Sequence, residues 1–311
     1  MKVVFDTDPG IDDAMALLYL NACDNLDLLA VTTIVGNASI DQCTLNALFL
    51  CEKFGIDVPV YKGAGRGIDG SEPGDFPDFV HGSNGLGDVI LAAPRISVES
   101  LDAYDYLVNI AKKYPDEITI VAVGRLTNLA LAIQSDPDFS GNIKDIIFMG
   151  GAYLCEGNVT PWAEANIIGD PEAAAIVFNS GITLTMVGLD VTMQTRMSND
   201  YLAKLAAGLG DLGDFVLNIN KVYAGYYQTS QGWDEFPVHD SSAVAWADNS
   251  NLFSTVSGKL DCVLTGEKLG QTVFEPHQTG AHKVCVSVDA KALLESYLNT
   301  IVGWQKNRTN Q

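Results

Sequence analysis

Hydrophobic and polar positions along this chain fall into two kinds of stretch. Short, almost wholly apolar runs rich in β-branched residues predict strands that are buried on both faces. Longer stretches with apolar residues every three or four positions predict amphipathic helices. The predicted strands are 2–5, 28–34, 118–123, 145–149 and 183–187. The predicted helices are 12–23, 39–54, 101–114, 126–134 and 171–179.

The regular alternation of these strands and helices predicts the fold class. Buried strands separated by helices are typical of an open, mostly parallel, Rossmann-like α/β sheet that is flanked by helices on both faces. The sequence contains no internal repeat, low-complexity tract or obvious linker, so we expect one domain over residues 1–311. A helical insertion is predicted around 199–231.

Two segments depart from this alternation. Residues 63–88 are rich in Gly, Pro and Asp and predict a long loop, of the kind that often serves as a lid or a binding loop. Residues 228–240 join a tyrosine-bearing helix to a new helix that is predicted to begin near Ser241.

Composition narrows the choice of partners and compartment. With 18 basic and 39 acidic residues, the net charge is −21, and no Lys/Arg run is present to neutralise the phosphates of a nucleic acid. No apolar run reaches the ~18 residues of a membrane span. The chain passes from Met1 and Lys2 directly into an apolar strand, so we expect no signal peptide. Six cysteines without a CxxC pair are expected to be buried thiols in a reducing compartment, and we expect a cytoplasmic protein.

An unusual acidic cluster lies near the N-terminus, in VVFDTDPGIDDAMALLYL. Asp6, Asp8, Asp12 and Asp13 lie where the first strand meets the first helix, and carboxylates this close raise one another's pKa unless a cation or several donors hold them. Ligands of parallel sheets bind at this end of the strands. Asp12 is a plausible N-cap, with Asp13 in the first turn, but capping needs only one carboxylate. A hard divalent cation explains the others.

Three other interpretations use the same aspartates. An EF-hand is excluded by spacing, because Gly10 falls at a ligand position and no Glu stands at the twelfth. A DxD-type metal-dependent phosphatase would use Asp6 as nucleophile and Asp8 as acid. Such an enzyme needs a cationic group to hold phosphate, and no lysine follows a later strand in an obvious position. A non-catalytic calcium- or sugar-binding protein would also account for the cluster.

The segment DTDPGIDDAMAL resembles the signature of the nucleoside hydrolases, which cleave the N-glycosidic bond of ribonucleosides. Further blocks resemble that family in the same order, from residue 1 to about 275. They are VTTIVGN at 31–37, HGSNGLG at 81–87, VAVGRLTNLALA at 121–132, FMGGAYLCEGNVTPWAEANIIGDPEAA at 148–174, MVGLDVT at 186–192 and VHDSSAVAW at 238–246. The series as a whole is far more specific than the first motif alone.

The resemblance implies one Ca²⁺ ion per chain. Its ligands would be Asp8, Asp13 (bidentate), Asp240 and the backbone carbonyl of Val123, a position at which the family usually has Thr. Asp8 would also take a proton from the attacking water, whose pKa calcium lowers. Asp6 would order the cluster and Asn37 from outside the ligand set.

The resemblance also implies residues that bind the ribose. Asp12 would bind the 2′-hydroxyl, and Asp240 would also contact the sugar. Asn158, Glu164 and Asn166 would hold the 5′- and 3′-hydroxyls. Because Glu164 and Asn166 are two apart, an extended segment would point both to one side. Asn37 is expected to support Asp13 or the groups bound to the metal.

The residues around the base are less well determined. His239 resembles the proton donor to the leaving base, and His81 is expected to contact the base. Tyr223 and Tyr227 share a helix face and resemble tyrosines near the base in the inosine-uridine type. Trp233 could stack on the base or close the loop. The presence of His239 favours the inosine-uridine or pyrimidine-specific branches over the purine-only branch. The family also implies a homodimer or homotetramer.

Overall fold

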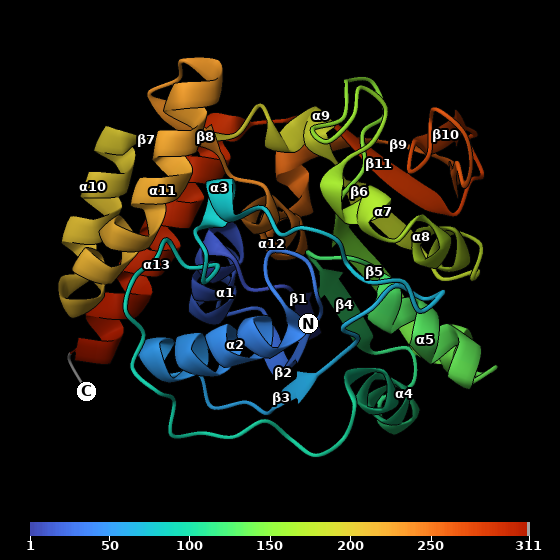
Figure 1. Ribbon diagram of the computed structural model, residues 1–311, viewed down its shortest axis with the longest axis horizontal. Helices are drawn as coiled ribbons and strands as arrows, with labels where there is room; N and C mark the ends of the chain where they lie inside the picture. Colours follow the sequence, from blue (N-terminus) through green and yellow to red (C-terminus); the bar gives the residue numbers. More distant parts are fainter. Residues whose placement is uncertain (310–311) are drawn as a thin grey trace.

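The computed structural model describes residues 1–309 and shows a central sheet between layers of helices (Figure 1). Within these residues, one sheet has nine strands in the order β10-β9-β11-β6-β5-β4-β1-β2-β3, and a separate ribbon pairs β7 with β8. The strands are β1 (Lys2–Thr7), β2 (Asp27–Thr33), β3 (Val60–Lys62), β4 (Ile118–Ala122), β5 (Ile143–Met149), β6 (Leu184–Val187), β7 (Arg196–Ser198), β8 (Glu235–Pro237), β9 (Phe253–Cys262), β10 (Thr272–Pro276) and β11 (His282–Val288).

The sheet is mostly parallel, which confirms the predicted α/β class. Strands from β3 through β1 to β6 and β11 pair in parallel, whereas β9 pairs antiparallel with both β11 and β10. The five predicted strands are confirmed to within two residues at each end. The antiparallel end formed by β9 and β10 was not predicted, because those strands are half-exposed and lack a continuous apolar run.

The predicted helices are confirmed with the same accuracy, and the helical insertion is present as α10 and α11. In Figure 1, α10, α11 and α13 lie together at one side of the molecule, away from β9 and β10. The helices are α1 (Ile11–Ala22), α2 (Ile40–Phe54), α3 (Asp78–His81), α4 (Ala103–Lys113), α5 (Thr127–Ser135), α6 (Phe139–Asn142), α7 (Ala165–Gly169), α8 (Pro171–Phe178), α9 (Leu189–Thr192), α10 (Asn199–Gly208), α11 (Gly213–Gln231), α12 (Asp240–Asp248) and α13 (Ala290–Thr309), with short 3₁₀ turns at Gly210–Leu212 and Ser250–Leu252.

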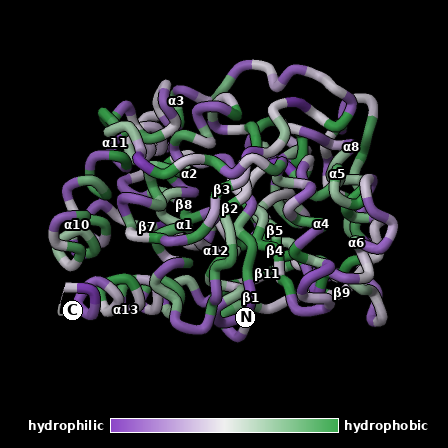
Figure 2. The backbone as a smooth tube through the Cα atoms, turned by 90° about the horizontal axis from the view of Figure 1, so that it is seen from below, coloured by the Kyte–Doolittle hydropathy of each residue, from purple (hydrophilic) through white to green (hydrophobic). Residues whose placement is uncertain are grey.

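Two hydrophobic cores cover the two faces of the sheet. Successive strand residues point to opposite faces, so Val3 and Phe5 join one core and Val4 joins the other. Figure 2 shows the most hydrophobic segments in the middle of the molecule. This burial on both faces is the reason that the central strands form continuous apolar runs.

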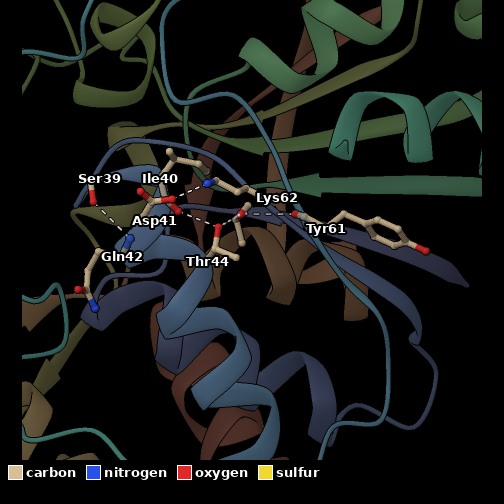
Figure 3. A network of polar contacts seen from close by, with 8 residues as sticks. Ser39, Ile40, Asp41, Gln42, Thr44, Tyr61 and Lys62 are labelled. Carbon is tan, nitrogen blue, oxygen red and sulfur yellow. Dashed lines mark hydrogen bonds and ion pairs between the residues drawn. The ribbon is translucent and has the colours of Figure 1, made fainter. Parts of the chain in front are cut away.

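Helix α2 illustrates how the connections after the strands are held. Ser39 caps the helix by accepting a hydrogen bond of 3.3 Å from the backbone N–H of Gln42 (Figure 3). The hydroxyl of Thr44 lies 2.9 Å from that of Thr33 at the end of β2. An ion pair joins Asp41 to Lys62 of β3 (Figure 3). These contacts tie the start of α2 to the carboxyl ends of β2 and β3.

The remaining sequence expectations have mixed outcomes. Residues 63–88 are a loop, as predicted, apart from the short helix α3. Five of the six cysteines are buried thiols, but Cys155 is exposed because it lies in the irregular segment after β5. Among residues 1–309, no helix combines the length and the apolar character needed to cross a bilayer.

The strand order determines where a ligand can bind. From β3 to β6, the order 3-2-1-4-5-6 is that of the doubly wound nucleotide-binding sheets, in which the order of the parallel strands reverses between β1 and β4. The connections after these two strands diverge to opposite faces and leave a crevice at their carboxyl ends. The acidic cluster follows β1, and Val123 follows β4.

Candidate active site

The carboxylate of Asp13 holds together the turn between β1 and α1. It accepts hydrogen bonds from the Thr7 hydroxyl (2.5 Å), the backbone N–H groups of Asp8 (3.2 Å) and Gly10 (2.9 Å), and the side-chain amide of Asn37 (2.9 Å). Gly10 is therefore the N-cap, and the expectation that Asp12 caps the helix is wrong. Asn37 supports Asp13, as expected. The turn needs a small residue at position 10, since a Cβ there would lie 2.6 Å from the His81 ring.

The carboxylate of Asp8 has one oxygen without a hydrogen-bond partner. Its Oδ2 accepts a hydrogen bond of 2.8 Å from the backbone N–H of Asn37, while its Oδ1 is buried without a hydrogen-bond partner. Gly36 and Gly124 pack against this carboxylate so closely that a Cβ would lie 1.9 Å and 2.6 Å from its oxygens. Burial, and then the charge of Asp13, raise the pKa of Asp8 well above its usual range.

Asp12 connects the first helix to the start of α12. Its Oδ2 accepts hydrogen bonds from the backbone N–H groups of His239 (3.0 Å) and Asp240 (3.1 Å). Burial raises the pKa of Asp12 to about 7. Burial, followed by the charges of Asp12, Asp13 and Asp8, raises the pKa of Asp240 well above its usual range. The hydrogen bond from the backbone N–H of Asp240 to Asp12 places the start of α12 beside the N-terminal turn.

Asp6 has a different role from the one expected. Its Oδ1 accepts hydrogen bonds from the Thr32 hydroxyl (2.6 Å) and the Asn128 amide (2.8 Å), and its Oδ2 is buried without a hydrogen-bond partner. The hydrogen bonds of Asn37 go to Asp8 and Asp13 and not to Asp6. Asp6 and Thr7 are successive residues of β1 and so point to opposite faces, Asp6 toward α5, whereas Asp8 lies beyond the end of the strand. Asp6 joins the ends of β1 and β2 to the start of α5, because Asn128 also donates to the carbonyl of Thr33.

The predicted ribose residues lie together beside the carboxyl end of β4. Asn166 donates from its side-chain amide to the carbonyls of Val123 (2.8 Å) and Met149 (3.1 Å). Glu164 caps α7 and accepts from the backbone N–H of Gly151 (2.9 Å). Asn158 accepts from the N–H of Ala165 (3.0 Å). The segment after Glu164 is helical and not extended as predicted, because the Glu164 carboxylate satisfies the free N–H groups at the start of α7.

The two motif histidines are buried and border the same cavity. His81 accepts a hydrogen bond at Nδ1 from the N–H of Ile11 (3.1 Å), so its remaining proton is on Nε2. The Nδ1 of His239 lies 2.8 Å from the Thr192 hydroxyl, and its Nε2 lies 3.1 Å from the Tyr227 hydroxyl. Burial lowers the pKa of His81 to about 3 and that of His239 to about 4, so both rings are neutral at pH 7.

A cavity of about 520 Å³ brings most of the predicted residues together. This volume suits a small-molecule ligand. The predicted residues that do not line it are Asp6, Asp8, Asp13 and Trp233. The structure therefore does not place Trp233 against a ligand as expected; its ring stacks on Tyr227 instead. The predicted residues that line the cavity are Asp12, Asn37, His81, Val123, Asn158, Glu164, Asn166, Tyr223, Tyr227, His239 and Asp240.

Several lining residues were not predicted. Phe79, Glu156, Met193, Tyr226 and Gln231 also border the cavity. Phe79 and Glu156 are each within two residues of a predicted site residue, and Tyr226 adjoins Tyr227. This proximity in the sequence to predicted site residues was the only signal from which their place in the cavity could have been predicted. Met193 follows the MVGLDVT block, and Gln231 is the last residue of α11.

The residues of the acidic cluster suit a hard divalent cation. Asp8, Asp12, Asp13 and Asp240 are buried, and none takes part in an ion pair within residues 1–309. Their raised pKa values and the unpartnered Asp8 Oδ1 indicate a site that a cation would stabilise. In the described part of the chain, no three acidic, His or Cys side chains already form a ready-made metal-binding group. The Asp13 oxygens already accept four hydrogen bonds, so a bidentate contact would require some of these donors to move.

The fold and the cavity define an α/β enzyme that binds a small polar ligand at the switch point of the sheet. A family model described as inosine-uridine preferring nucleoside hydrolase matches residues 3–295. The chain is 41% identical over 275 residues to uridine nucleosidase 1 of Arabidopsis thaliana, covering 88% of this chain and 82% of that one. It is 35% identical to the pyrimidine-specific ribonucleoside hydrolase RihB of Escherichia coli, over 88% of this chain and 87% of that one.

A solved structure agrees with these sequence relatives. The purine-preferring ribonucleoside hydrolase from Gardnerella vaginalis superimposes with a TM-score of 0.94 at 31% identity, covering 99% of this chain and 100% of that one. The chain therefore belongs to the inosine-uridine preferring nucleoside hydrolase family, and it is an enzyme that hydrolyses the N-glycosidic bond of ribonucleosides.

Proposed function

We propose that the enzyme is a calcium-dependent hydrolase with uridine as its best substrate, which releases ribose and the free base. The observation that carries this proposal is the Asp8 carboxylate, which is buried with one oxygen unpartnered, next to a cavity that the buried carboxylates of Asp12 and Asp240 line. Residues 1–311 would act as a single domain.

The ion would be held by Asp8, Asp13, Asp240 and the carbonyl of Val123, and when bound it would supply positive charge that makes the attacking water more acidic. Asp8 would accept the proton of that water. A bond would form between the water oxygen and the anomeric carbon, and the bond from that carbon to the base nitrogen would break. The surrounding carboxylates would stabilise the positive charge that develops on the sugar ring.

Ribose selection would depend on acceptors and donors at the start of α1 and α7. Asp12 would accept from the 2′-hydroxyl, and Asp240 would add a further sugar contact. Asn158, Glu164 and Asn166 would hold the 3′- and 5′-hydroxyls. Glu164 and Asn166 are well suited to this, because their hydrogen bonds to the backbone fix their positions before a ligand arrives.

The base leaves with the electron pair of the broken bond and needs a hydrogen-bond or proton donor. His239 would be that donor, either through its own N–H or through the Tyr227 hydroxyl at its Nε2. Because the His239 ring is neutral at pH 7, its support would be a hydrogen bond that becomes proton transfer as charge develops on the base. His81, Tyr223 and Tyr227 would surround the base.

The preference for uridine is supported by the name of the plant relative, a uridine nucleosidase, and the name of the bacterial relative supports a preference for pyrimidines. A second candidate is a broader enzyme that also accepts purine nucleosides. It is favoured by the structural likeness to the purine-preferring Gardnerella protein and by the size of the cavity. The two differ in a measurable quantity, the ratio of kcat/KM for uridine to that for inosine.

The decisive experiment measures release of reducing sugar from uridine, cytidine, inosine and adenosine without phosphate. Each assay is run after exhaustive chelation and again after addition of Ca²⁺. The proposal predicts release that depends on Ca²⁺ and is fastest with uridine. Equal rates for uridine and inosine would replace it with the broader enzyme, and full activity after chelation would remove calcium from the proposal.

A further inference from the structure

The chain reverses direction after α11 in a way that places Trp233 behind Tyr227. Gly232 ends the helix with φ of 70°, a left-handed conformation that favours glycine. The Trp233 ring then lies parallel to the Tyr227 ring, with 6.1 Å between centroids and 5° between planes. Trp233 is half-buried and lies outside the cavity lining, whereas Tyr227 lines it.

Arg196 covers the Trp233 ring. The guanidinium carbon lies 3.8 Å from the ring centroid, a close cation–π contact. Two further contacts fix the guanidinium: Nε donates to the carbonyl of Met193 (2.9 Å), and Nη1 lies 3.1 Å from a carboxylate oxygen of Glu235. Because the ion pair with Glu235 is partly exposed, the position of the Arg196 guanidinium is fixed mainly by its stacking on Trp233 and its hydrogen bond to the Met193 carbonyl.

The same ribbon that holds Arg196 also leads to His239. Arg196 pairs with Pro237 across β7 and β8, and the N–H of Val238 donates to the carbonyl of Thr195 (2.9 Å). Tyr227 on α11 therefore contacts Trp233, and Trp233 contacts Arg196. Arg196 in turn pairs with β8, the strand that leads to His239. Their polar contact is the 3.1 Å approach of the Tyr227 hydroxyl to His239 Nε2.

We propose that Arg196 and Trp233 are positioning residues, which form a stacked column with Tyr227 and hold its hydroxyl against His239 so that the pair can support the leaving base. This proposal rests on the proposed function, because it requires that the base departs near His239. A tyrosine side chain has two rotatable bonds, and a flat ring stacked on one face restricts both. Neither Arg196 nor Trp233 has to touch the substrate.

The test compares a natural nucleoside with a substrate that does not need help in leaving. Uridine requires support of its base, whereas p-nitrophenyl riboside has a leaving group that departs unaided. Loss of one aromatic contact in Trp233→Ala should lower kcat on uridine about tenfold while kcat on p-nitrophenyl riboside stays within about twofold. Trp233→Phe, which keeps a flat ring, should restore most of the uridine activity. Arg196→Met, which keeps the length of the side chain, should show a smaller selective loss.

A matched control is provided by Trp304, whose ring is covered by Arg308 at 5.3 Å on α13. Trp304→Ala removes a comparable contact and should leave the ratio of the two activities unchanged. Equal loss on both substrates in Trp233→Ala, or a change in KM alone, would overturn the proposal. If that variant does not fold, Arg196→Met decides the question by the same ratio, and an unchanged ratio in that variant would overturn the proposal. A wild-type enzyme inactive on both substrates would instead refute the proposed function.

Discussion

The carboxylate of Asp12 accepts a hydrogen bond of 3.1 Å from the backbone N–H of Asp240, although 228 residues separate the two. This contact joins the first turn of α1 to the first turn of α12. It brings Asp240, a residue of the proposed metal site, to the three aspartates that follow β1, which are Asp8, Asp12 and Asp13. Because both residues are buried and acidic, their proximity is costly until a cation neutralises them.

Calcium should therefore stabilise the folded enzyme as well as activate it. Added Ca²⁺ should raise the melting temperature of chelated protein, and at about a hundred times its Kd the stabilisation should be about 2.7 kcal/mol. Differential scanning calorimetry measures this without any substrate. Mg²⁺ serves as the comparison, since it demands stricter octahedral geometry. An unchanged melting temperature with Ca²⁺ would argue against an ion among these carboxylates.

Asp8→Asn should remove both the proton acceptor and one metal ligand. We expect kcat on uridine to fall by about a thousandfold or more, in the range of general base catalysis. The stabilisation by Ca²⁺ should fall in the same variant. Asp24→Asn is the matched control, because Asp24 is an exposed aspartate outside the cavity and should behave like wild type. Steady-state kinetics of both variants, together with their melting curves, make the comparison.

Gly36→Ala should disturb Asp8 without adding or removing a polar group. The new Cβ would lie 1.9 Å from Asp8 Oδ2, so the carboxylate or the backbone must shift. Such displacements cost about a hundredfold in rate when they move a catalytic group. Gly303→Ala, in α13 with nothing within 4 Å of the new Cβ, should be active and slightly more stable. Wild-type kcat in Gly36→Ala would contradict the role given to Asp8.

His239→Ala should separate natural nucleosides from activated ones. We expect kcat on uridine to fall about a hundredfold or more, because the leaving base loses its donor. The rate with p-nitrophenyl riboside should change little. Tyr227→Phe, which removes only the hydroxyl at His239 Nε2, should show a weaker loss of the same kind. A similar fall on both substrates would mean that His239 supports the site and does not assist the leaving base.

Asp6 should make stability depend on pH. Burial raises its folded-state pKa from 3.8 to about 6, so the folded state binds more protons than the unfolded state between these values. Stability should therefore decrease as pH rises from about 4 to 6, by roughly 3 kcal/mol from this residue. Asp6→Asn keeps an oxygen for Thr32 and Asn128 and should flatten that slope. Urea unfolding of chelated wild type and variant at pH 4.5 and 7 would measure the difference, and parallel slopes would contradict it.

The sequence by itself determined the central sheet and much of the site. Strands buried on both faces must be apolar throughout, so 118–123 and 183–187 could be recognised without the structure. The acidic turn could be recognised because four carboxylates exceed what a helix cap needs. Half-exposed β9 and β10 carry no such constraint, and only pairing with β11 makes them strands.

Only the tertiary structure decided how individual side chains are used. Asp6 and Asp8 are two positions apart and each keeps one oxygen without a partner, yet the other oxygen of Asp6 is held by Thr32 and Asn128 and that of Asp8 by the backbone of Asn37. Trp233 could not be separated from the base site by its position in the sequence, because its place depends on Arg196, 37 residues earlier, which stacks on it. Local patterns specify elements through burial and backbone geometry. The partner of a polar or aromatic side chain is set by contacts between distant segments, which no local pattern contains.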